Sequence, residues 1–371
     1  MIRPLVLFLP SWYPNRVTPT NGNFIRNHAR VANRVAEVLV LYAQPDANCE
    51  QFEIQDTTFE GFREVIVYYP KASTKLSRYF CFFKYRWKGW RYLKKKTGKP
   101  QLIHVHVAFP AGVFALCLRF FCGVKYVVTE HWSGYLKKNI TEMHWLHKFI
   151  FQHSTLNSAV SKHLMADIKE LTGTKGWKTL PNLVLNTFFK KQETGDRSKT
   201  ILHISNFNSL KNSLKIIQGL EVLLLENEEI KLLMIGENEG EKDACRQYVL
   251  ANKKLNAKVH FEDVMEPAYI AALMRNATCL VSFSDYETQG ITVLEALACG
   301  LPVVSSDIAP MNTYKLEGVV LAKTPEEICQ QVRYFLAHPE LADSLEMQEF
   351  AVKFSEESLI LKFKKIYAEV L

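Results

Sequence analysis

Two glutamates flank a glycine in the second half of the chain, within the segment SDYETQGITVLEALACGLPVVSSD over residues 284–307. Glu287 and Glu295 are eight positions apart, and Gly290 precedes an apolar run, Ile291 to Ala298, that predicts a helix. The free backbone N–H groups and the dipole of such a helix start form a site for an anion such as a diphosphate. Carboxylates that accept paired hydrogen bonds suit the vicinal hydroxyls of a ribose or a sugar ring. The spacing therefore points to a nucleotide sugar.

The alternative for this segment is an ordinary amphipathic helix with a solvated Glu295 and a surface Glu287. Glu295, however, lies among Val293, Leu294 and Ala296, and apolar surroundings rarely tolerate an idle charge. Two glutamates at this separation are common in proteins. The whole segment, rather than the pair alone, favours a binding site.

Two more polar residues follow expected strands, where a doubly wound sheet places its ligand loops. His131 comes just after a strand at 126–129 and could donate to a developing charge or to a sugar hydroxyl. Lys211 follows a strand at 200–204, where a lysine is a mobile positive charge for a diphosphate leaving group. The alternatives are a structural histidine and a solvated lysine. For His104 and His106, which alternate with apolar residues, packing is the default expectation.

The elements that must position these residues form a pattern that repeats. Continuous apolar strands alternate with helical segments, which indicates parallel, doubly wound sheets. In the first half the expected strands are 5–9, 38–41, 65–69, 102–107, 126–129 and one near 157–161; after the predicted linker at 183–199 they are 200–204, 231–235, 259–261, 279–283 and 303–306. The tail, 354–371, predicts an amphipathic helix. The expected fold is α/β with two Rossmann-like domains.

Bulk composition describes a folded protein without a membrane span. The chain of 371 residues is long enough for two domains, and 48% hydrophobic and 23% charged residues are ordinary for a globular protein. Eight scattered cysteines without a C-x-x-C pair favour buried thiols in a reducing cytosol over disulfides or a metal site. No run approaches the roughly 18 apolar residues that a bilayer span needs. The N-terminus reads as a first strand rather than a signal peptide.

The charge is distributed unevenly. Residues 1–190 carry a net charge of +16 and the remainder carries −8, with no acidic residue between Glu64 and Glu130. Inside that gap, residues 75–99 interleave cations with aromatic rings: Lys84, Arg86, Lys88, Arg91, Lys94, Lys95 and Lys96 with Phe80, Phe82, Phe83, Trp87, Trp90 and Tyr92. This mixture suits a membrane surface. A solvated helix face over buried rings is the alternative, while nucleic acid is not expected because no nucleic-acid module accompanies the stretch.

The segment at 284–307 also resembles the donor-site signature of glycosyltransferase family 4, with Glu, seven residues, Glu, an Ala-rich turn and Gly-x-Pro-Val-Val. The resemblance implies the GT-B architecture, two Rossmann-like domains facing across a cleft. It implies that Glu295 binds the ribose hydroxyls and that Glu287 contacts the donor sugar. Backbone amides around the glycine, at Gln289, Gly290 and Ile291, would approach the sugar and phosphates.

Other positions match the family less specifically. Gly22, in Asn-Gly-Asn after the first strand, matches a glycine loop that lets the backbone approach the donor phosphate or the acceptor. His131 matches a histidine close to the transferred sugar. Lys211 matches the lysine of a Gly-Arg-x-x-x-x-Lys motif, but Asn206 stands where the arginine would fall. One cation is therefore replaced by a neutral amide.

Two further positions are implied to lie near the nucleotide. Gly236 matches a family glycine, and backbone groups around Val264 would hold the base, although Glu262 and Asp263 stand where the family has a glycine. The chain contains no D-x-D pair, so we expect no required metal.

Together these features predict a retaining hexosyl-type glycosyltransferase. It would use a UDP- or GDP-sugar and act on a hydroxyl of a lipid-linked saccharide in surface polysaccharide synthesis, at the inner face of the cytoplasmic membrane. The expected domains are an acceptor-side domain at 1–185, a donor-binding domain at 186–353 and a helix at 354–371 that returns to the first domain. A GT-B sugar phosphorylase or soluble synthase is one alternative. A catalytically silent nucleotide-sugar-binding or membrane scaffold protein is the other, kept open by Asn206.

Overall fold

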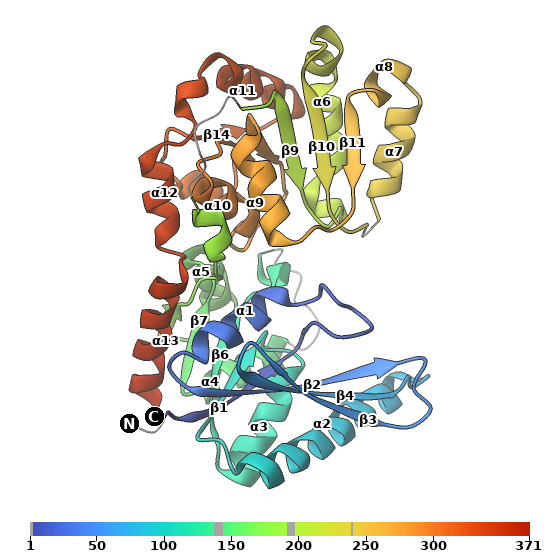
Figure 1. Cartoon of the computed structure of the whole chain (residues 1–371). Helices are drawn as coiled ribbons and strands as arrows, with labels where there is room; N and C mark the ends of the chain where they lie inside the picture. The colour runs from blue at the N-terminus through green and yellow to red at the C-terminus, as the bar shows by residue number, and fades with distance from the viewer. Residues whose placement is uncertain (1–2, 137–143, 191–196, 239) are drawn as a thin grey trace. The chain divides into compact units, whose positions relative to one another are not determined.

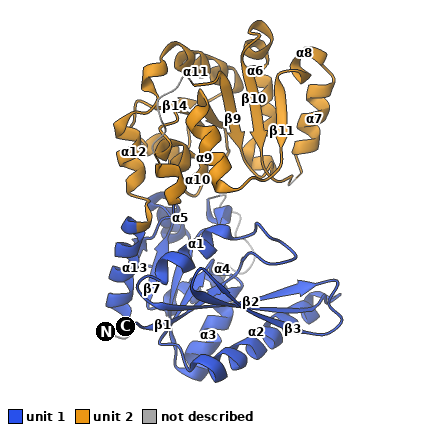
Figure 2. Cartoon of the chain, in the orientation of Figure 1, with its two compact units in different colours: residues 1–183, 357–371 blue, residues 184–356 orange. Residues whose placement is uncertain are grey.

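The computed structural model describes residues 3–136, 144–190, 197–238 and 240–371. The chain divides into two compact units, one of residues 1–183 with 357–371 and one of residues 184–356 (Figures 1 and 2). We call them the first and the second unit. The expected boundaries at 185 and 353 differ from these by two and three residues. Part of the linker predicted at 183–199 lies outside the described residues.

The first unit contains an eight-stranded sheet in the order β3-β4-β2-β1-β5-β6-β7-β8. Its strands are parallel except β3, which is antiparallel to β4. Their bounds are β1 Leu5–Pro10, β2 Glu37–Asp46, β3 Glu53–Phe59, β4 Phe62–Pro70, β5 Leu102–His106, β6 Lys125–Glu130, β7 Leu156–Ala159 and β8 Trp177–Thr179. The sequence did not reveal β3, because this edge strand is polar and no residue in it is fully buried.

In the described part of the first unit, five helices connect these strands, and a sixth reaches the sheet from the end of the chain (Figure 1). They are α1 Asn23–Ala32, α2 Lys75–Thr97, α3 Ala111–Cys122, α4 His144–His153, α5 Lys162–Thr172 and α13 Glu356–Val370. The Tyr367 hydroxyl of α13 lies 2.9 Å from Nδ1 of His104, and Nζ of Lys125 donates to the Val370 carbonyl over 3.3 Å. Figure 2 shows α13 coloured with the first unit. The prediction that the C-terminal helix returns to this unit is confirmed.

The second unit is built on a fully parallel six-stranded sheet in the order β11-β10-β9-β12-β13-β14. The strands are β9 Thr200–Ile204, β10 Lys231–Ile235, β11 Val259–Glu262, β12 Cys279–Ser282, β13 Val303–Ser306 and β14 Val319–Ala322. The helices are α6 Ser213–Glu226, α7 Lys242–Leu250, α8 Lys253–Asn256, α9 Pro267–Asn276, α10 Ile291–Ala298, α11 Pro325–Ala337 and α12 Leu345–Val352. One apolar core lies under α6 and α11 and another under α9, α10 and α12, so both faces of the sheet are covered.

Both sheets reverse their strand order near the middle. The reversal falls between β1 and β5 in the first unit and between β9 and β12 in the second. In doubly wound sheets the loops that follow the carboxyl ends of these strands diverge and form the ligand site. The residues after β1, β5, β9 and β12 are therefore the places to search for function.

Two global expectations concern membrane spans and thiols. Within the described ranges, no helix combines the length and the apolarity required to cross a bilayer. All eight cysteines are free thiols, but the expectation that they are buried holds only for Cys245, Cys279 and Cys299, since the other five are partly exposed.

Candidate functional site

The loops after β9 and β12 bring Lys211 and Glu287 together in the second unit. Nζ of Lys211 donates to Oε1 of Glu287 over 2.5 Å, and the Ser284 hydroxyl donates to the same oxygen over 3.0 Å. The side chains of Lys211 and Glu287 are 25% and 14% exposed. Two residues that the sequence singled out separately thus form one partly buried ion pair at the reversal of the strand order. Ser284 was not among the predicted residues.

The two loops are joined by further hydrogen bonds. Asn212 donates from Nδ2 to Oδ1 of Asp285 over 2.6 Å and to the Phe283 carbonyl over 3.1 Å. The backbone N–H of Asp285 donates to the Leu210 carbonyl over 2.9 Å. These bonds hold the lysine loop against the glutamate loop, so the backbone of Lys211 is placed beside Glu287 in the ligand-free chain, while the lysine side chain can still turn. Asn212 has φ of 50°, a left-handed conformation that asparagine adopts more readily than most residues.

Gly290 caps the N-terminus of α10 in a left-handed conformation, with φ 74° and ψ 60°. A Cβ at this position would lie 2.5 Å from Cε of Met311, so the backbone is closely covered on one side. The preceding Gln289 is buried, and its carbonyl accepts a 2.9 Å hydrogen bond from the Tyr314 hydroxyl. Ile291 opens the helix. The turn is thereby fixed where the first free N–H groups of α10 begin.

Glu295 lies one turn inside α10 and is partly buried. Desolvation is the cause that raises the pKa of this carboxyl to about 8. A carboxyl in apolar surroundings is unfavourable for the folded chain. It is therefore either a destabilising structural feature or a group that accepts hydrogen bonds from a bound ligand. Because its neighbours Leu294 and Ala296 are fully buried, the sequence-based expectation of an apolar setting is confirmed.

A buried lysine that the sequence did not reveal holds the ends of β10 and β11. Lys242, the first residue of α7, has a side chain that is 1% exposed. Its Nζ donates to the carbonyls of Gly236 and Glu262, both over 2.7 Å, and to Oδ1 of Asp263 over 2.8 Å. Val264, which follows this clamp, is 56% exposed. Gly236 and the segment 262–264, which are expected near the nucleotide base, are therefore linked by Lys242, a buried cation that holds their backbone carbonyls.

Gly236 and Asn206 lie at the adjacent strand ends. Gly236 has φ of 141°, and a Cβ there would lie 1.7 Å from the carbonyl oxygen of Ser205, so no other residue fits without a backbone shift. Asn206 follows Ser205 in the loop after β9 and is partly buried. The close approach of the two strand ends explains why glycine stands at position 236.

In the first unit, Gly22 performs a similar steric role. It caps α1 with φ of 77°, and a Cβ would lie 2.7 Å from the carbonyl oxygen of Trp12. The loop after β1 therefore passes directly over the start of α1. Only glycine permits both the left-handed conformation and this contact.

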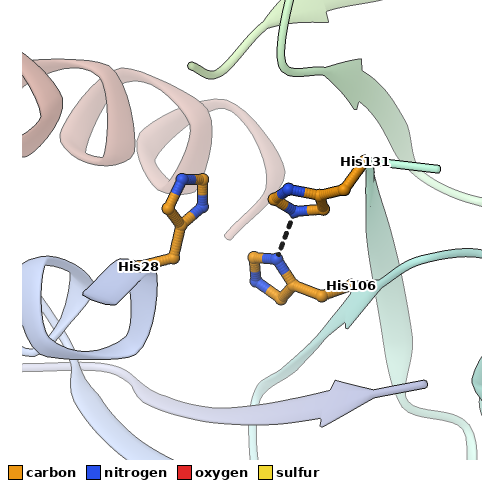
Figure 3. Close-up of side chains that lie close together, drawn as sticks. All are labelled: His28, His106 and His131. Carbon is orange, nitrogen blue, oxygen red and sulfur yellow. Dashed lines mark hydrogen bonds between the residues drawn. The ribbon is translucent and has the colours of Figure 1, made fainter. Parts of the chain in front are cut away.

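His131 does not lie alone: it forms a buried cluster with His106 of β5 and His28 of α1 (Figure 3). Nε2 of His131 lies 3.1 Å from Nδ1 of His106, and Nδ1 of His131 lies 3.1 Å from Oδ1 of Asn182. Burial lowers the pKa of all three histidines, that of His28 to about 4. The sequence suggested that His106 packs, and it gave no signal for His28, which occupies the buried face of an ordinary amphipathic helix.

Glu130 organises the strand end that carries His131. This buried carboxyl accepts hydrogen bonds from the backbone N–H groups of Ala108, His131 and Trp132 over 2.8 to 2.9 Å. Desolvation raises its pKa, opposed by these hydrogen bonds. The carboxyl thus joins the loops after β5 and β6.

The basic and aromatic stretch forms α2, and its side chains divide between two environments. Leu76 and Phe80 are 81% and 66% exposed, and the three lysines at 94–96 are also exposed. Trp90 is buried in the core of the first unit. Arg86, which the sequence counted among the surface cations, is buried with its guanidinium 3.6 Å above the Phe82 ring. The exposed face therefore carries fewer cations and rings than the sequence suggested.

Family models match both units. The model described as Glycosyltransferase Family 4 matches residues 23–184, and the model described as Glycosyl transferases group 1 matches residues 186–350. A curated relative, N-acetyl-alpha-D-glucosaminyl L-malate synthase of Bacillus anthracis, is 22% identical over 292 residues, which are 73% of this chain and 75% of the relative.

Solved structures share the fold over its whole length. Sucrose-phosphate synthase of Thermosynechococcus elongatus superposes with a TM-score of 0.77 at 16% identity, covering 99% of this chain and 98% of that one. Anabaena Alr3699/HepE in complex with UDP and glucose gives 0.76 at 14% identity, covering 99% and 100%. These likenesses confirm the predicted GT-B fold.

Proposed function

The chain belongs to glycosyltransferase family 4, and from this premise we propose that it transfers a sugar from a nucleotide diphosphate sugar to a hydroxyl of a lipid-linked saccharide. One observation carries the proposal: at the strand reversal of the second unit, Lys211 and Glu287 meet across 2.5 Å. The glycine-capped start of α10 and the partly buried Glu295 follow in the same segment. A cation, free amides and two carboxylates are the groups that a diphosphate, a ribose and a sugar require.

Each group has a separate task in this proposal. The first N–H groups of α10, at Gly290 and Ile291, receive the diphosphate, and Glu295 accepts hydrogen bonds from the ribose hydroxyls. Glu287 accepts from hydroxyls of the donor sugar. Lys211, paired with Glu287 without a ligand, turns to the diphosphate when the donor enters and stabilises the charge of the leaving group.

The transfer would retain the anomeric configuration, as the family resemblance implies. The bond from the anomeric carbon to the diphosphate oxygen breaks as the acceptor oxygen bonds to the same face. The acceptor proton passes to the departing phosphate oxygen, so no protein nucleophile is required. Asn206 supplies a neutral amide in place of the family arginine, which leaves Lys211 as the principal cation in this step.

The donor is proposed to be a UDP- or GDP-sugar. The complex of the structurally similar Anabaena protein with UDP supports a uridine nucleotide as the first candidate. The base would lie beside Gly236 and Val264, where Lys242 holds the backbone carbonyls of Gly236 and Glu262. The exposed Val264 offers an apolar surface against which a base can pack.

The acceptor is proposed to be lipid-linked because α2 exposes apolar side chains near its N-terminal end and cations in its last turn. Leu76 and Phe80 could enter the headgroup region while Lys94 and Lys95 contact anionic lipid phosphates. The enzyme would then act as a peripheral protein on the cytoplasmic face of the membrane.

The experiment that tests the proposal is thermal unfolding with UDP, GDP, ADP and CDP. A nucleotide that binds the folded chain at about 100 times its dissociation constant adds roughly 2.7 kcal/mol to the free energy of unfolding. We expect one nucleotide to raise the melting temperature of the wild type and of Glu349→Ala, an exposed glutamate of α12, but not of Glu295→Ala. No shift with any nucleotide would favour the silent scaffold alternative.

A further inference from the structure

Three histidines from separate elements meet beside the strand reversal of the first sheet. His28 lies on α1, His106 ends β5, and His131 follows β6 (Figure 3). All three are buried, and each offers a ring nitrogen within 4.8 Å of the others. Ring nitrogens that are closed off from water need partners, so the hydrogen bonds of the cluster decide what it can bind.

The outer hydrogen bonds fix the tautomers of two rings. Nε2 of His28 lies 3.0 Å from the Pro181 carbonyl, which can only accept, so Nε2 carries the proton and Nδ1 is a bare lone pair. Nδ1 of His131 lies 3.1 Å from the amide oxygen of Asn182, so this ring carries its proton on Nδ1 and its lone pair on Nε2. Both lone pairs belong to the nitrogens opposite the outer hydrogen bonds.

The third ring completes the pattern. Nδ1 of His106 donates to the Nε2 lone pair of His131 over 3.1 Å, which leaves Nε2 of His106 bare. Among the described residues, neither Nδ1 of His28 nor Nε2 of His106 has a hydrogen-bond partner. The fourth nearby histidine, His104, differs: its nitrogens contact the Tyr367 and Thr129 hydroxyls over 2.9 and 2.7 Å.

We propose that His28, His106 and His131 bind one divalent transition-metal ion, with Zn²⁺ as the best match. Three neutral imidazoles and one water form a common tetrahedral zinc site, and imidazole nitrogens suit Zn²⁺, Co²⁺ and Ni²⁺. Ring N–H groups held by a backbone carbonyl and an amide oxygen are the outer hydrogen bonds that orient metal-binding histidines.

The distances require only a local adjustment. Zn–N bonds of 2.0–2.1 Å place tetrahedral ligand nitrogens about 3.3 Å apart. The facing nitrogens of His106 and His131 are already 3.1 Å apart. Binding through Nδ1 of His106 requires the proton of that ring to move to Nε2, which has no acceptor among the described residues, and the His28 nitrogen must approach from its present distance within 4.8 Å. Phe24, a partly buried ring, packs against the cluster with its centroid 4.8 Å from that of the His131 ring.

A bound ion would join α1, β5 and the loop after β6, and would therefore stabilise the first unit. Its three ligands are not among the residues proposed to bind the diphosphate, although the family resemblance implies that His131 lies near the transferred sugar. Its presence or absence can consequently be measured without any sugar donor.

The test is metal binding by the full chain after treatment with a chelator. Titration with Zn²⁺ against a chromophoric chelator should give one ion per chain for the wild type and for His260→Ala, an exposed histidine. We expect at least a 100-fold loss of affinity in His28→Gln, which keeps a donor for Pro181, and in His106→Gln. Asn182→Ala keeps all three rings and should lose 10- to 100-fold. Co²⁺ should give the visible absorption of a tetrahedral nitrogen site.

Failure of the wild type to bind Zn²⁺ or Co²⁺ stoichiometrically would overturn the proposal. Equal binding by His28→Gln and His106→Gln would overturn it as well. If the glutamine variants do not fold, the Co²⁺ spectrum of the wild type decides the question alone.

Discussion

Glu295 is a carboxyl whose protonation in the folded chain differs from that of an ordinary glutamate. Burial raises its pKa from 4.5 to about 8, so the folded chain holds a proton there that the unfolded chain releases above pH 4.5. Stability from this residue is therefore present at low pH and is lost as the pH rises toward 8. A ligand that supplies hydroxyl hydrogens compensates this loss, which fits the proposed ribose contact.

The Glu295→Gln variant tests the shift directly. Glutamine mimics the protonated carboxyl, so we expect equal free energies of unfolding near pH 4.5 and a more stable variant at pH 8, by on the order of 2 kcal/mol or more. Urea unfolding of both proteins at pH 4.5, 6 and 8 measures the difference. A difference that does not change with pH would contradict the assigned environment.

Lys211→Met removes the positive charge proposed to stabilise the leaving group. Because such a charge acts most strongly in the transition state, we expect the rate of nucleotide diphosphate release to fall about 10²- to 10³-fold. Lys215→Met, an exposed lysine on α6, is the matched control and should keep the wild-type rate. An unchanged rate in Lys211→Met would show that this lysine does not stabilise the leaving group and serves only in the ion pair with Glu287.

At the scale of elements, the turn into α10 decides how the first helical amides are presented. Gly290→Ala adds a methyl group in a left-handed conformation, 2.5 Å from the flexible end of Met311. We expect a loss of about 1–2 kcal/mol in stability together with weaker nucleotide binding. Gly173→Ala has nearly the same φ, 65°, with no atom within 4 Å, and should lose stability alone. Nucleotide titration of both variants distinguishes the two effects.

If the exposed face of α2 contacts a membrane, changes to that face should reduce binding to lipid vesicles. Co-sedimentation with anionic liposomes should decrease several-fold when Leu76 and Phe80 are changed to serine or Lys94 and Lys95 to glutamine, since both lipid contacts contribute. Matched controls are Leu250→Ser and the pair Lys253→Gln and Lys254→Gln, which alter equally exposed residues of the second unit. If all variants sediment with liposomes like the wild type, α2 is not a membrane contact.

At the scale of the whole molecule, the sequence predicted the buried strands but did not predict the edge strands β3 and β14. The bounds of β9, β10 and β13 agree with the sequence because continuous apolar runs mark strands that are covered on both faces. The β3 strand is polar and has no such run, and β14 is an apolar run of only four residues that is mostly half-buried, so neither was recognised from the sequence. Apolar patterns report burial and carry little information on partly exposed strands.

The sequence identified several residues of the candidate site but did not predict which of them contact one another. Motif positions identified Lys211 and Glu287, yet their ion pair joins residues 76 positions apart and depends on the order of the strands. The burial of Lys242 could not be predicted because its neighbours in sequence are strongly polar. Its three oxygen partners belong to the ends of β10 and β11. Likewise, the meeting of three histidines follows from the sheet topology rather than from any local pattern.

The measurement that tests the proposed function most directly is transfer of labelled sugar from UDP- and GDP-hexoses to a bacterial lipid-linked saccharide extract. We predict that the wild type and Glu349→Ala move label from one of these donors into the lipid fraction, without added phosphate, while Glu287→Ala loses about 10²- to 10³-fold in rate with its fold intact. Absence of transfer with every donor, or equal transfer by Glu287→Ala, would contradict the assignment of this site.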